Sequence, residues 1–291
     1  VLDLGARQLG LDPVHVRRIN LIGAADLPYT SATRLVHDSP SYPVCLDKAV
    51  ETIDYAAFRA EQARQRTHGR LLGIGFAVYN ELTGLGQAAS AGPRMPFRTG
   101  HEGATVRLDP SGAVTVLAGM TSQGQGLETT MAQLAAAELG APVDVVTVVL
   151  GDTDVTPFGL GAFASRQAVI GGGAVVRAAA AVREKALHIA AHLLEASADD
   201  LDVADGIVSV RGTPGRTVTL REVAHVALLE TQRLPPGTEP GLHATRFYDP
   251  ILGTFAAGAQ PAVVEVDPAT GLVTIRRFVC VEDTGRIINP L

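Results

Sequence analysis

The sequence contains no tryptophan, few other aromatic residues and only two cysteines. Aromatic residues make up 4% of the 291 residues, so alanine, valine and leucine must fill most of any core. Cys45 and Cys280 lie far apart in the chain and do not form a metal-type pair. This cysteine usage is typical of a reducing compartment, and we therefore expect a cytoplasmic protein.

Two further absences exclude classes of partner. No apolar run reaches the roughly 18 residues that a membrane-spanning helix needs, and the first residues do not have the pattern of a signal peptide. Acidic residues outnumber basic ones, 30 to 24, which gives a net charge of −6. This balance argues against a nucleic-acid partner and against a membrane partner.

The remaining composition is that of a globular protein, with 46% hydrophobic and 19% charged residues. Helical periodicity is present at 1–20 with a break at Gly10, and again at Cys45–Arg66, 167–197 and 219–230. Thr219 and Glu222 fit a capping box. Residues 23–45 and 231–243 are rich in turn-forming residues and are expected to be irregular.

Strand patterns complete the prediction of a mixed α/β (α+β) fold, in which mixed sheets carry flanking helices. Single strands are predicted at 71–82 and 143–150, and a short hairpin with Asp205-Gly206 at its tip is predicted at 201–212. Near residues 66–72 the helical pattern gives way to glycine-rich strand patterns, and we place a domain boundary there.

A longer hairpin pattern occurs twice. Residues 103–119 and 261–279 both alternate apolar and polar side chains around a turn that begins Asp-Pro, at Asp109 and Asp267. The first copy continues into a glycine-rich turn and a helix. If the repeat is genuine, a second strand-to-helix unit follows residue 291, and the chain is an internal piece of a longer polypeptide.

The glycine-rich turn is the stretch "GMTSQGQG", which ends in Gln123, Gly124, Gln125 and Gly126. A tight turn between a strand and a helix would explain the glycines. A ligand would explain them too, because helix N-termini present unpaired N–H groups and glutamine amides both donate and accept. Neither the Walker pattern nor the dinucleotide pattern GxGxxG is matched. Taken alone, the stretch favours the structural interpretation.

A second glycine-rich helix entry, "GLGAFASRQ" at 159–167, changes that balance. Ser165 is a candidate N-cap, or its hydroxyl could contact a ligand, and Arg166 is suited to a phosphate. Two such entries can direct their N–H groups at one extended, phosphate-bearing ligand. The candidate residues of this loop are Ala162, Phe163, Ala164, Ser165, Arg166 and Gln167.

Other candidates are weaker. One helical stripe could hold a metal, but a solvated charged face is the favoured interpretation of Glu184, His188, His192 and Glu195. Asp152, Asp154 and Asp283 are expected to cap turns. We find no nucleophile with its base around Ser122, His101 or Cys280, and no glutamate suited to act as a base, so no catalytic residue is assigned.

Several motifs together resemble the molybdenum-hydroxylase family, the molybdopterin-binding large subunits of xanthine dehydrogenase, aldehyde oxidase and aerobic carbon monoxide dehydrogenase. The motifs span nearly the whole chain: "LDPVHVRRINLI", "GRLLGIGFAVYNELTGLG", "SQGQGLETTMAQLAAAELG", "VVLGDTDVTPFGLGAFASRQ", "VVEVDPATGLV" and "VEDTGRIINP". The forms "ELTGLG" and "GLGAFASR" are similar to the bacterial branch that uses the cytosine dinucleotide form of the cofactor.

The resemblance implies a two-subdomain molybdopterin-binding fold. Residues 1–68 would form the C-terminal part of the first subdomain, and 69–291 the second, truncated at its C-terminus. Both glycine-rich loops would bind molybdopterin with its molybdenum, and 81–87 would help to line the substrate path. The implied partners are an Fe-S small subunit, an FAD medium subunit and the rest of the same large subunit.

The resemblance also implies an activity for the complete enzyme, the oxidation or hydroxylation of a small molecule (CO, an aldehyde or an N-heterocycle) with oxygen from water. The family's catalytic glutamate corresponds to no residue of this chain, so we expect the chain alone to be inactive. Two alternatives stay open, a non-catalytic module that binds a pterin or nucleotide, and a structural paralogue that binds no cofactor.

Overall fold

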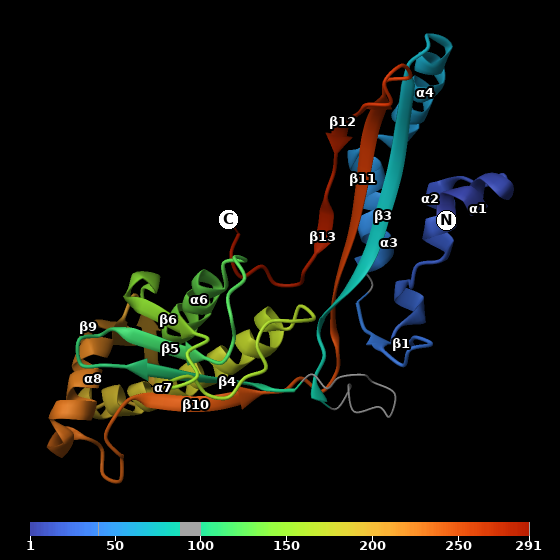
Figure 1. Ribbon diagram of the computed structural model, residues 1–291. Coiled ribbons are helices and arrows are strands. Elements are labelled where there is room, and N and C mark those ends of the chain that lie inside the picture. Colours follow the sequence, from blue (N-terminus) through green and yellow to red (C-terminus); the bar gives the residue numbers. More distant parts are fainter. Residues whose placement is uncertain (40, 88–99, 291) are drawn as a thin grey trace. The chain divides into compact units, whose positions relative to one another are not determined.

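A computed structural model describes residues 1–39, 41–87 and 100–290. Contacts within the chain divide it into two compact units (Figure 1). Unit 1 comprises Val1–Leu82 and Gly253–Arg286, and unit 2 comprises Thr83–Leu252 and Ile287–Leu291. This division does not follow a single boundary near residue 68. The subdomain limits implied by the family resemblance stay a prediction.

Unit 2 is built on a four-stranded mixed sheet with the order β10-β4-β5-β6. The strands are β4 (Glu102–Leu108), β5 (Val114–Ala118), β6 (Val146–Leu150) and β10 (His243–Tyr248). β4 pairs antiparallel with β5 as the predicted hairpin, and β10 pairs antiparallel with β4. β5 and β6 are parallel, so helix α6 (Leu127–Leu139) must carry the chain back between them.

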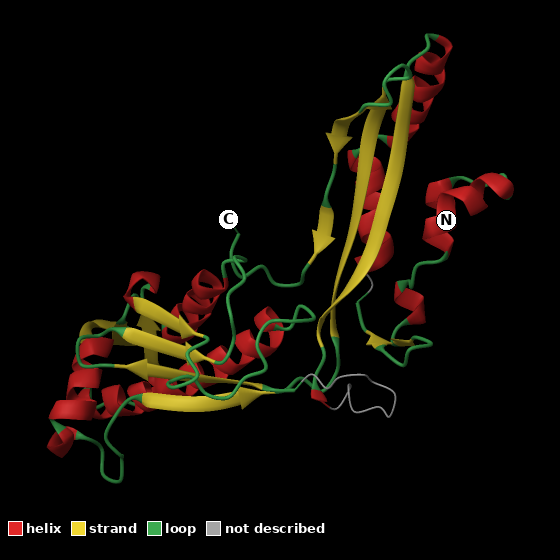
Figure 2. Ribbon diagram, in the orientation of Figure 1, coloured by secondary structure: helices red, strands yellow, loops and turns green. Residues whose placement is uncertain are grey.

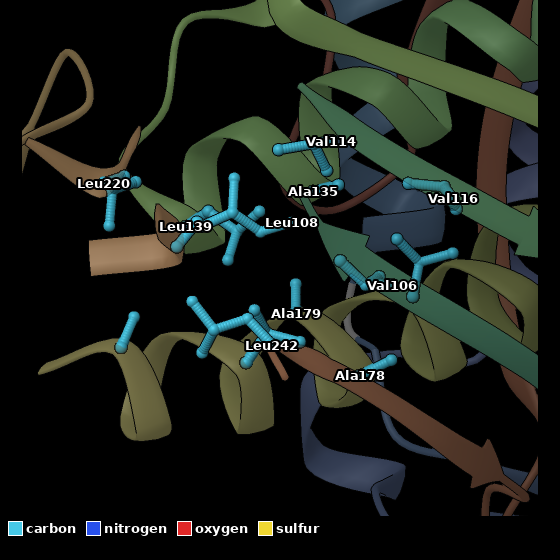
Figure 3. Close-up of a cluster of buried hydrophobic side chains, with 14 of the residues drawn as sticks. Val106, Leu108, Val114, Val116, Ala135, Leu139, Ala178, Ala179, Leu220 and Leu242 are labelled. Atoms are coloured by element: carbon cyan, nitrogen blue, oxygen red, sulfur yellow. The ribbon is translucent and has the colours of Figure 1, made fainter. Parts of the chain in front are cut away.

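Two helices cover one face of this sheet, α6 and the longer α7 (Gly172–Leu193), which pack against each other (Figure 2). Alternate residues of β4 and β5 point into the core, so that Val106 faces the helices beside Val116, and Leu108 beside Val114. Figure 3 shows these side chains against alanines of the two helices, including Ala178. The small helical residues let helix and sheet approach closely, as the scarcity of aromatic residues requires.

The rest of unit 2 extends this core. A small antiparallel sheet has the order β7-β8-β9, formed by β7 (Leu201–Ala204), β8 (Ile207–Val210) and β9 (Thr213–Thr219). The predicted tip at Asp205 and Gly206 is confirmed, and both residues have positive φ, at 50° and 75°. Helix α8 (Leu220–Leu229) follows, and its capping box of Thr219 and Glu222 is also confirmed.

Unit 1 contains a second four-stranded sheet. It is formed by β3 (Leu71–Gly84), β11 (Thr254–Val266), β12 (Val273–Phe278) and β13 (Val281–Asp283), with β11 paired to the other three. Helix α3 (Ser41–Thr52) packs on β11 and β13. Leu46 and Ala49 of this helix, and Ile53 just after it, are buried in one cluster with Phe76 and Ala259 of the strands.

Unit 1 contains further helices and strands. They are α1 (Leu2–Gln8), α2 (Pro13–Ile19), α4 (Tyr55–Thr67) and the two-residue strands β1 (Tyr29–Thr30) and β2 (Val36–His37). The predicted break at Gly10 is confirmed, and Asp12 caps α2. Within the described residues, every helix is too short or too polar to traverse a lipid bilayer.

Three local predictions were wrong. The strand expected at 143–150 begins only at Val146, after a 3-10 turn at Val143–Val145. Cys45–Arg66 is not one helix, because the chain breaks at Asp54, whose φ is 54° and whose carboxylate caps α4. The span 23–45 is not wholly irregular, since it contains β1, β2 and the start of α3. Strand β10 and the first half of β11 were not predicted, because their residues do not alternate as cleanly as those of the two hairpins.

The start of the longest helix differs from a regular α-helix. Its first turn, η3 (Gln167–Gly171), is π-helical, and α7 continues from it. The Gly171-Gly172-Gly173 run at this start packs tightly against side chains of neighbouring elements. A Cβ on these glycines would contact Met120, Leu134 and Tyr248, respectively.

We predict that Gly173→Ala destabilises unit 2, although alanine favours helices by about 1 kcal/mol over glycine. The new Cβ would lie 2.7 Å from Cε1 of the Tyr248 ring. That ring is itself covered by Arg177, whose guanidinium carbon lies 4.7 Å from the ring centroid. We expect the free energy of unfolding to fall by roughly 1–2 kcal/mol, as measured by denaturant titration.

The matched control is Gly172→Ala in the same helix. Its Cβ would lie 3.0 Å from a terminal methyl of Leu134, which can move aside, and 3.7 Å from Met131 Cε, which is an ordinary contact. We expect this variant to be as stable as the original chain or slightly more stable. Equal losses in the two variants would show that the Tyr248 ring does not limit the packing of α7.

A second prediction concerns the pH dependence of the α8 cap. The backbone N–H and the hydroxyl of Thr219 donate to the Glu222 carboxylate, which lowers its pKa below the ordinary value. The stabilisation is therefore present above the ordinary pKa of about 4.3 and is lost as pH falls through the lower folded-state pKa. Glu222→Gln keeps the cap but removes the charge.

We expect Glu222→Gln to cost roughly 0.5 kcal/mol of unfolding free energy near neutral pH, because the charge favours the helix N-terminus. The difference between the two proteins should be smaller at about pH 3 than near neutral pH, because the carboxylate loses its charge as pH falls. Denaturant titrations at both pH values measure it. A difference that is the same at both pH values would contradict an electrostatic contribution of Glu222.

Candidate functional site

The two glycine-rich loops meet at one edge of the unit 2 sheet. β5 and β6 are parallel neighbours, and their last residues, Ala118 and Leu150, pair directly. The chain from Gly119 to Gly126 leaves β5 and enters α6, and 151–166 leaves β6 and enters η3 and α7. Ligands of α/β sheets bind outside the carboxyl ends of parallel strands. Parallel pairing thus brings together the two loops that the sequence predicts to act on one ligand.

The loops touch through their backbones at two glycines. A Cβ on Gly119 would lie 2.6 Å from the Pro157 carbonyl oxygen and 2.7 Å from the Gly159 nitrogen. A Cβ on Gly159 would lie 2.7 Å from the Gly119 carbonyl oxygen. Side chains at these positions would separate the loops, so the glycines here permit a close approach of one loop to the other.

Side-chain amides connect the loops a second time. Gln125 Nε2 donates to Gln167 Oε1, and Gln167 Nε2 donates to the Thr121 carbonyl at 2.6 Å. Gln125 Oε1 in turn accepts from the backbone N–H of Gln123 at 2.7 Å. Gln167 is buried, whereas Gln123 and Gln125 are exposed. The buried amide therefore holds the exposed turn in a defined shape.

The first loop presents open backbone. Residues 121–126 are all exposed, and no atom lies within 4 Å of a Cβ built on Gly124 or Gly126. Both glycines have positive φ, 88° and 72°, and Gly126 is the N-cap of α6 without a side-chain cap. The turn is therefore open at both glycines and leads into a helix N-terminus that has no side-chain cap, which suits a hydrogen-bonding ligand.

The second loop is arranged differently. Phe163, Ala164 and Ser165 are exposed, Ala162 is partly exposed, and Arg166 and Gln167 are buried. Of the two alternatives for Ser165, the N-cap position is wrong, because Arg166 occupies that position. The first turn after Arg166 is π-helical, a feature that is frequent at functional sites.

Arg166 has a partner that the sequence did not indicate. Its guanidinium is fully buried and forms an ion pair with Glu102, which is also fully buried. It further donates to the carbonyls of Gly100 at 2.8 Å and Gly161 at 3.1 Å. A direct bond from Arg166 to a phosphate stays a prediction, and most of its donors are occupied by protein acceptors. Glu102 had no local signal, because its burial depends on tertiary contacts.

The weaker candidates have structural partners. Asp152 accepts from the Asp154 N–H at 3.0 Å and Asp283 from the Gly285 N–H at 2.9 Å, which confirms both as turn caps. Ser122 donates to Glu128 at 2.9 Å. In the part of the chain that the structure describes, no three His, Cys, Asp or Glu side chains form a group suited to a metal ion.

The chain is similar to known proteins over its whole length. A sequence model of the molybdopterin cofactor-binding domain matches residues 48–291. The nicotine 6-hydroxylase large subunit of Paenarthrobacter nicotinovorans is 37% identical over 292 residues, which cover 100% of this chain and 35% of that protein. The carbon monoxide dehydrogenase large chain of Hydrogenophaga pseudoflava is 36% identical over 297 residues, with 100% and 36% coverage.

Solved structures agree with these sequence matches. The crystal structure of quinoline 2-oxidoreductase from Pseudomonas putida 86 superimposes with a TM-score of 0.90 at 42% sequence identity, over 99% of this chain and 36% of that chain. The chain thus spans about a third of the length of the relatives that it matches.

We predict that Gln167→Met lowers the free energy of unfolding and loosens the 121–126 turn. Methionine fills a similar volume, but it leaves the Gln125 amide and the Thr121 carbonyl without this partner. The expected loss is about 1 kcal/mol, because both groups can turn to water. Denaturant titration measures the loss, and hydrogen exchange of the 121–126 amides, which should become faster, measures the loosening.

Gln133→Met is the matched control on α6. The Oε1 atom of Gln133 is buried without a hydrogen-bond partner in the described structure, so its removal should be neutral or stabilising. Slower exchange or unchanged stability in Gln167→Met would contradict a bridging role for Gln167.

Proposed function

Because the chain belongs to the molybdopterin cofactor-binding domain family, we propose that it forms the cofactor-binding part of a molybdenum hydroxylase large subunit. The observation that carries this proposal is the meeting of both glycine-rich loops at the carboxyl edge of β5 and β6, where Gln125 and Gln167 connect them. The same edge is the expected ligand position of an α/β sheet.

The residues present at this edge fit such a cofactor. A pterin offers ring nitrogens, a ring carbonyl and an exocyclic amino group to hydrogen bonds, and the glutamine amides of the first loop both donate and accept. Its acceptor atoms need N–H donors, and the uncovered backbone at Gly124 and Gly126 leads into the N-terminus of α6. Because Gly124 and Gly126 have no side chains, a ligand can approach the backbone of this turn directly.

We assign the cofactor to both loops. Gln123, Gly124, Gln125 and Gly126 would contact the pterin from one side, and the loop of Ala162, Phe163, Ala164, Ser165, Arg166 and Gln167 would hold the other side and the phosphate. When bound, the molybdenum cofactor supplies the redox chemistry that transfers oxygen from water to a small molecule. The residues of this chain bind and orient it.

The finer assignments are proposals of the same kind. The cofactor form is the cytosine dinucleotide, and an Fe-S subunit, an FAD subunit and further segments of the large subunit complete a cytoplasmic enzyme. The names of the relatives support a small substrate, since they refer to nicotine, quinoline and carbon monoxide. We assign no proton transfer to this chain, and we propose that it has no hydroxylase activity by itself.

The test is Gln125→Ala in the full-length polypeptide that contains this chain, purified with its partner subunits. The change removes one amide from the proposed pterin contact and from the bridge to Gln167. Each hydrogen bond of this type contributes about 1 kcal/mol, so the loss of more than one should weaken cofactor retention roughly tenfold. Molybdenum is measured by mass spectrometry, and CMP is measured after acid release.

Gln8→Ala, an exposed change on α1, is the control and should leave both contents unchanged. A purified wild-type protein without molybdenum and pterin would refute the proposed function. Wild-type cofactor content in Gln125→Ala would refute only the assignment of the 123–126 turn.

A further inference from the structure

We propose that Glu102 is a positioning residue of this site, whose buried carboxylate fixes the shape of the 159–166 loop through Arg166. The inference rests on the proposed function and goes beyond it, because neither the motifs nor the two glycine-rich loops include Glu102. It begins β4, on the strand next to β5, so it reaches the site from a different element.

One carboxylate oxygen of Glu102 holds both ends of the second loop. Glu102 Oε1 accepts the backbone N–H of Leu160 at 2.9 Å and also accepts from Arg166 Nη1. The loop between Leu160 and Arg166 contains four of the six second-loop residues that are assigned to the cofactor, and Arg166 is a fifth. The separation of its two ends is therefore set by one side chain.

Arg166 extends this arrangement to the chain that precedes β4. Nη2 donates to the carbonyls of Gly100 at 2.8 Å and His101 at 3.2 Å, and Nη1 donates to the Gly161 carbonyl at 3.1 Å. Both charged groups are fully buried, so each needs the other, and neither can turn to water. The planar guanidinium fixes the directions of these bonds, which a single ammonium cannot do.

The loop that they hold is in a conformation that needs such support. Ala164 and Ser165 have φ of 49° and 54°, two successive left-handed residues that are not glycine, directly before Arg166. Conformations of this kind persist where surrounding contacts determine them, and they are concentrated at functional sites. The ion pair anchors the residue that follows the two strained positions.

Glu102 also lies next to Gly159, the residue at which the second loop touches the first. A Cβ on Gly159 would contact Glu102 Oε2 on one side and the Gly119 carbonyl oxygen, at 2.7 Å, on the other. Only glycine fits between the carboxylate and the first loop. The position of Glu102 therefore limits where both loops can lie.

A purely stabilising role would not explain the pair. Buried ion pairs are weak contributors to stability, because the cost of removing two charges from water offsets their attraction, and apolar pairs of similar volume often replace them without loss. A stabilising role and a positioning role therefore predict different results when both Glu102 and Arg166 are replaced. Stability should survive the replacement, and the fixed geometry of the loop should not.

The experiment uses the full-length polypeptide with its partner subunits. Glu102→Gln combined with Arg166→Met replaces both charges, and we expect a melting temperature close to that of the wild type. Molybdenum and CMP content should fall about tenfold, the size of effect found when groups that support a metal site are removed. The matched control combines Asp202→Asn with Arg211→Met, which removes an exposed ion pair of unit 2 and should retain all cofactor.

Arg166→Lys tests the same point if the double variant does not fold. Lysine keeps a positive charge beside Glu102 but lacks the planar guanidinium, whose N–H donors point in fixed directions. The protein should therefore fold with about tenfold lower cofactor content. Hydrogen exchange at the Leu160 amide should become faster, which is a readout that needs no cofactor. A folded variant with wild-type cofactor content and wild-type exchange would overturn the inference, whereas a wild-type protein without cofactor would refute the proposed function instead.

Discussion

The parallel pairing of β5 with β6 is the constraint on which the rest of unit 2 depends. Parallel neighbours cannot be joined by a tight turn, so α6 must return the chain across the sheet, and both strands end at the same edge. The turn that enters α6 and the loop that enters α7 therefore begin side by side. The ligand-facing geometry follows from this pairing, because neither loop has a helix or strand of its own to fix its place.

The close contact of the two loops also depends on residues without side chains. Gly119 and Gly159 let the backbones touch, and Gly171 and Gly173 let the start of α7 lie against Met120 and Tyr248. An alanine-rich core makes the same approach possible between helices and sheet. Because the chain has no tryptophan, small side chains must fill its core. Small side chains let neighbouring backbones pack closely, as they do at this site.

Polar groups then determine the details of the site. Gln167 connects the first loop to the second through amide hydrogen bonds, and Glu102 connects the second loop to β4 through Arg166. Two buried polar side chains thus support two exposed loops. The exposed residues are left with open backbone for a ligand, and the ion pair lies beneath it.

The sequence by itself determined the elements that have strong local signals. Both Asp-Pro hairpins, the Asp205-Gly206 tip, the capping box of α8 and the break at Gly10 were predicted, because turn and cap chemistry acts over a few residues. It also identified both glycine-rich loops and the family. Tertiary structure decided the pairing of β5 with β6 and the burial of Glu102 with Arg166. These depend on contacts between residues that are distant in the chain, and a buried glutamate has no local pattern that separates it from an exposed one.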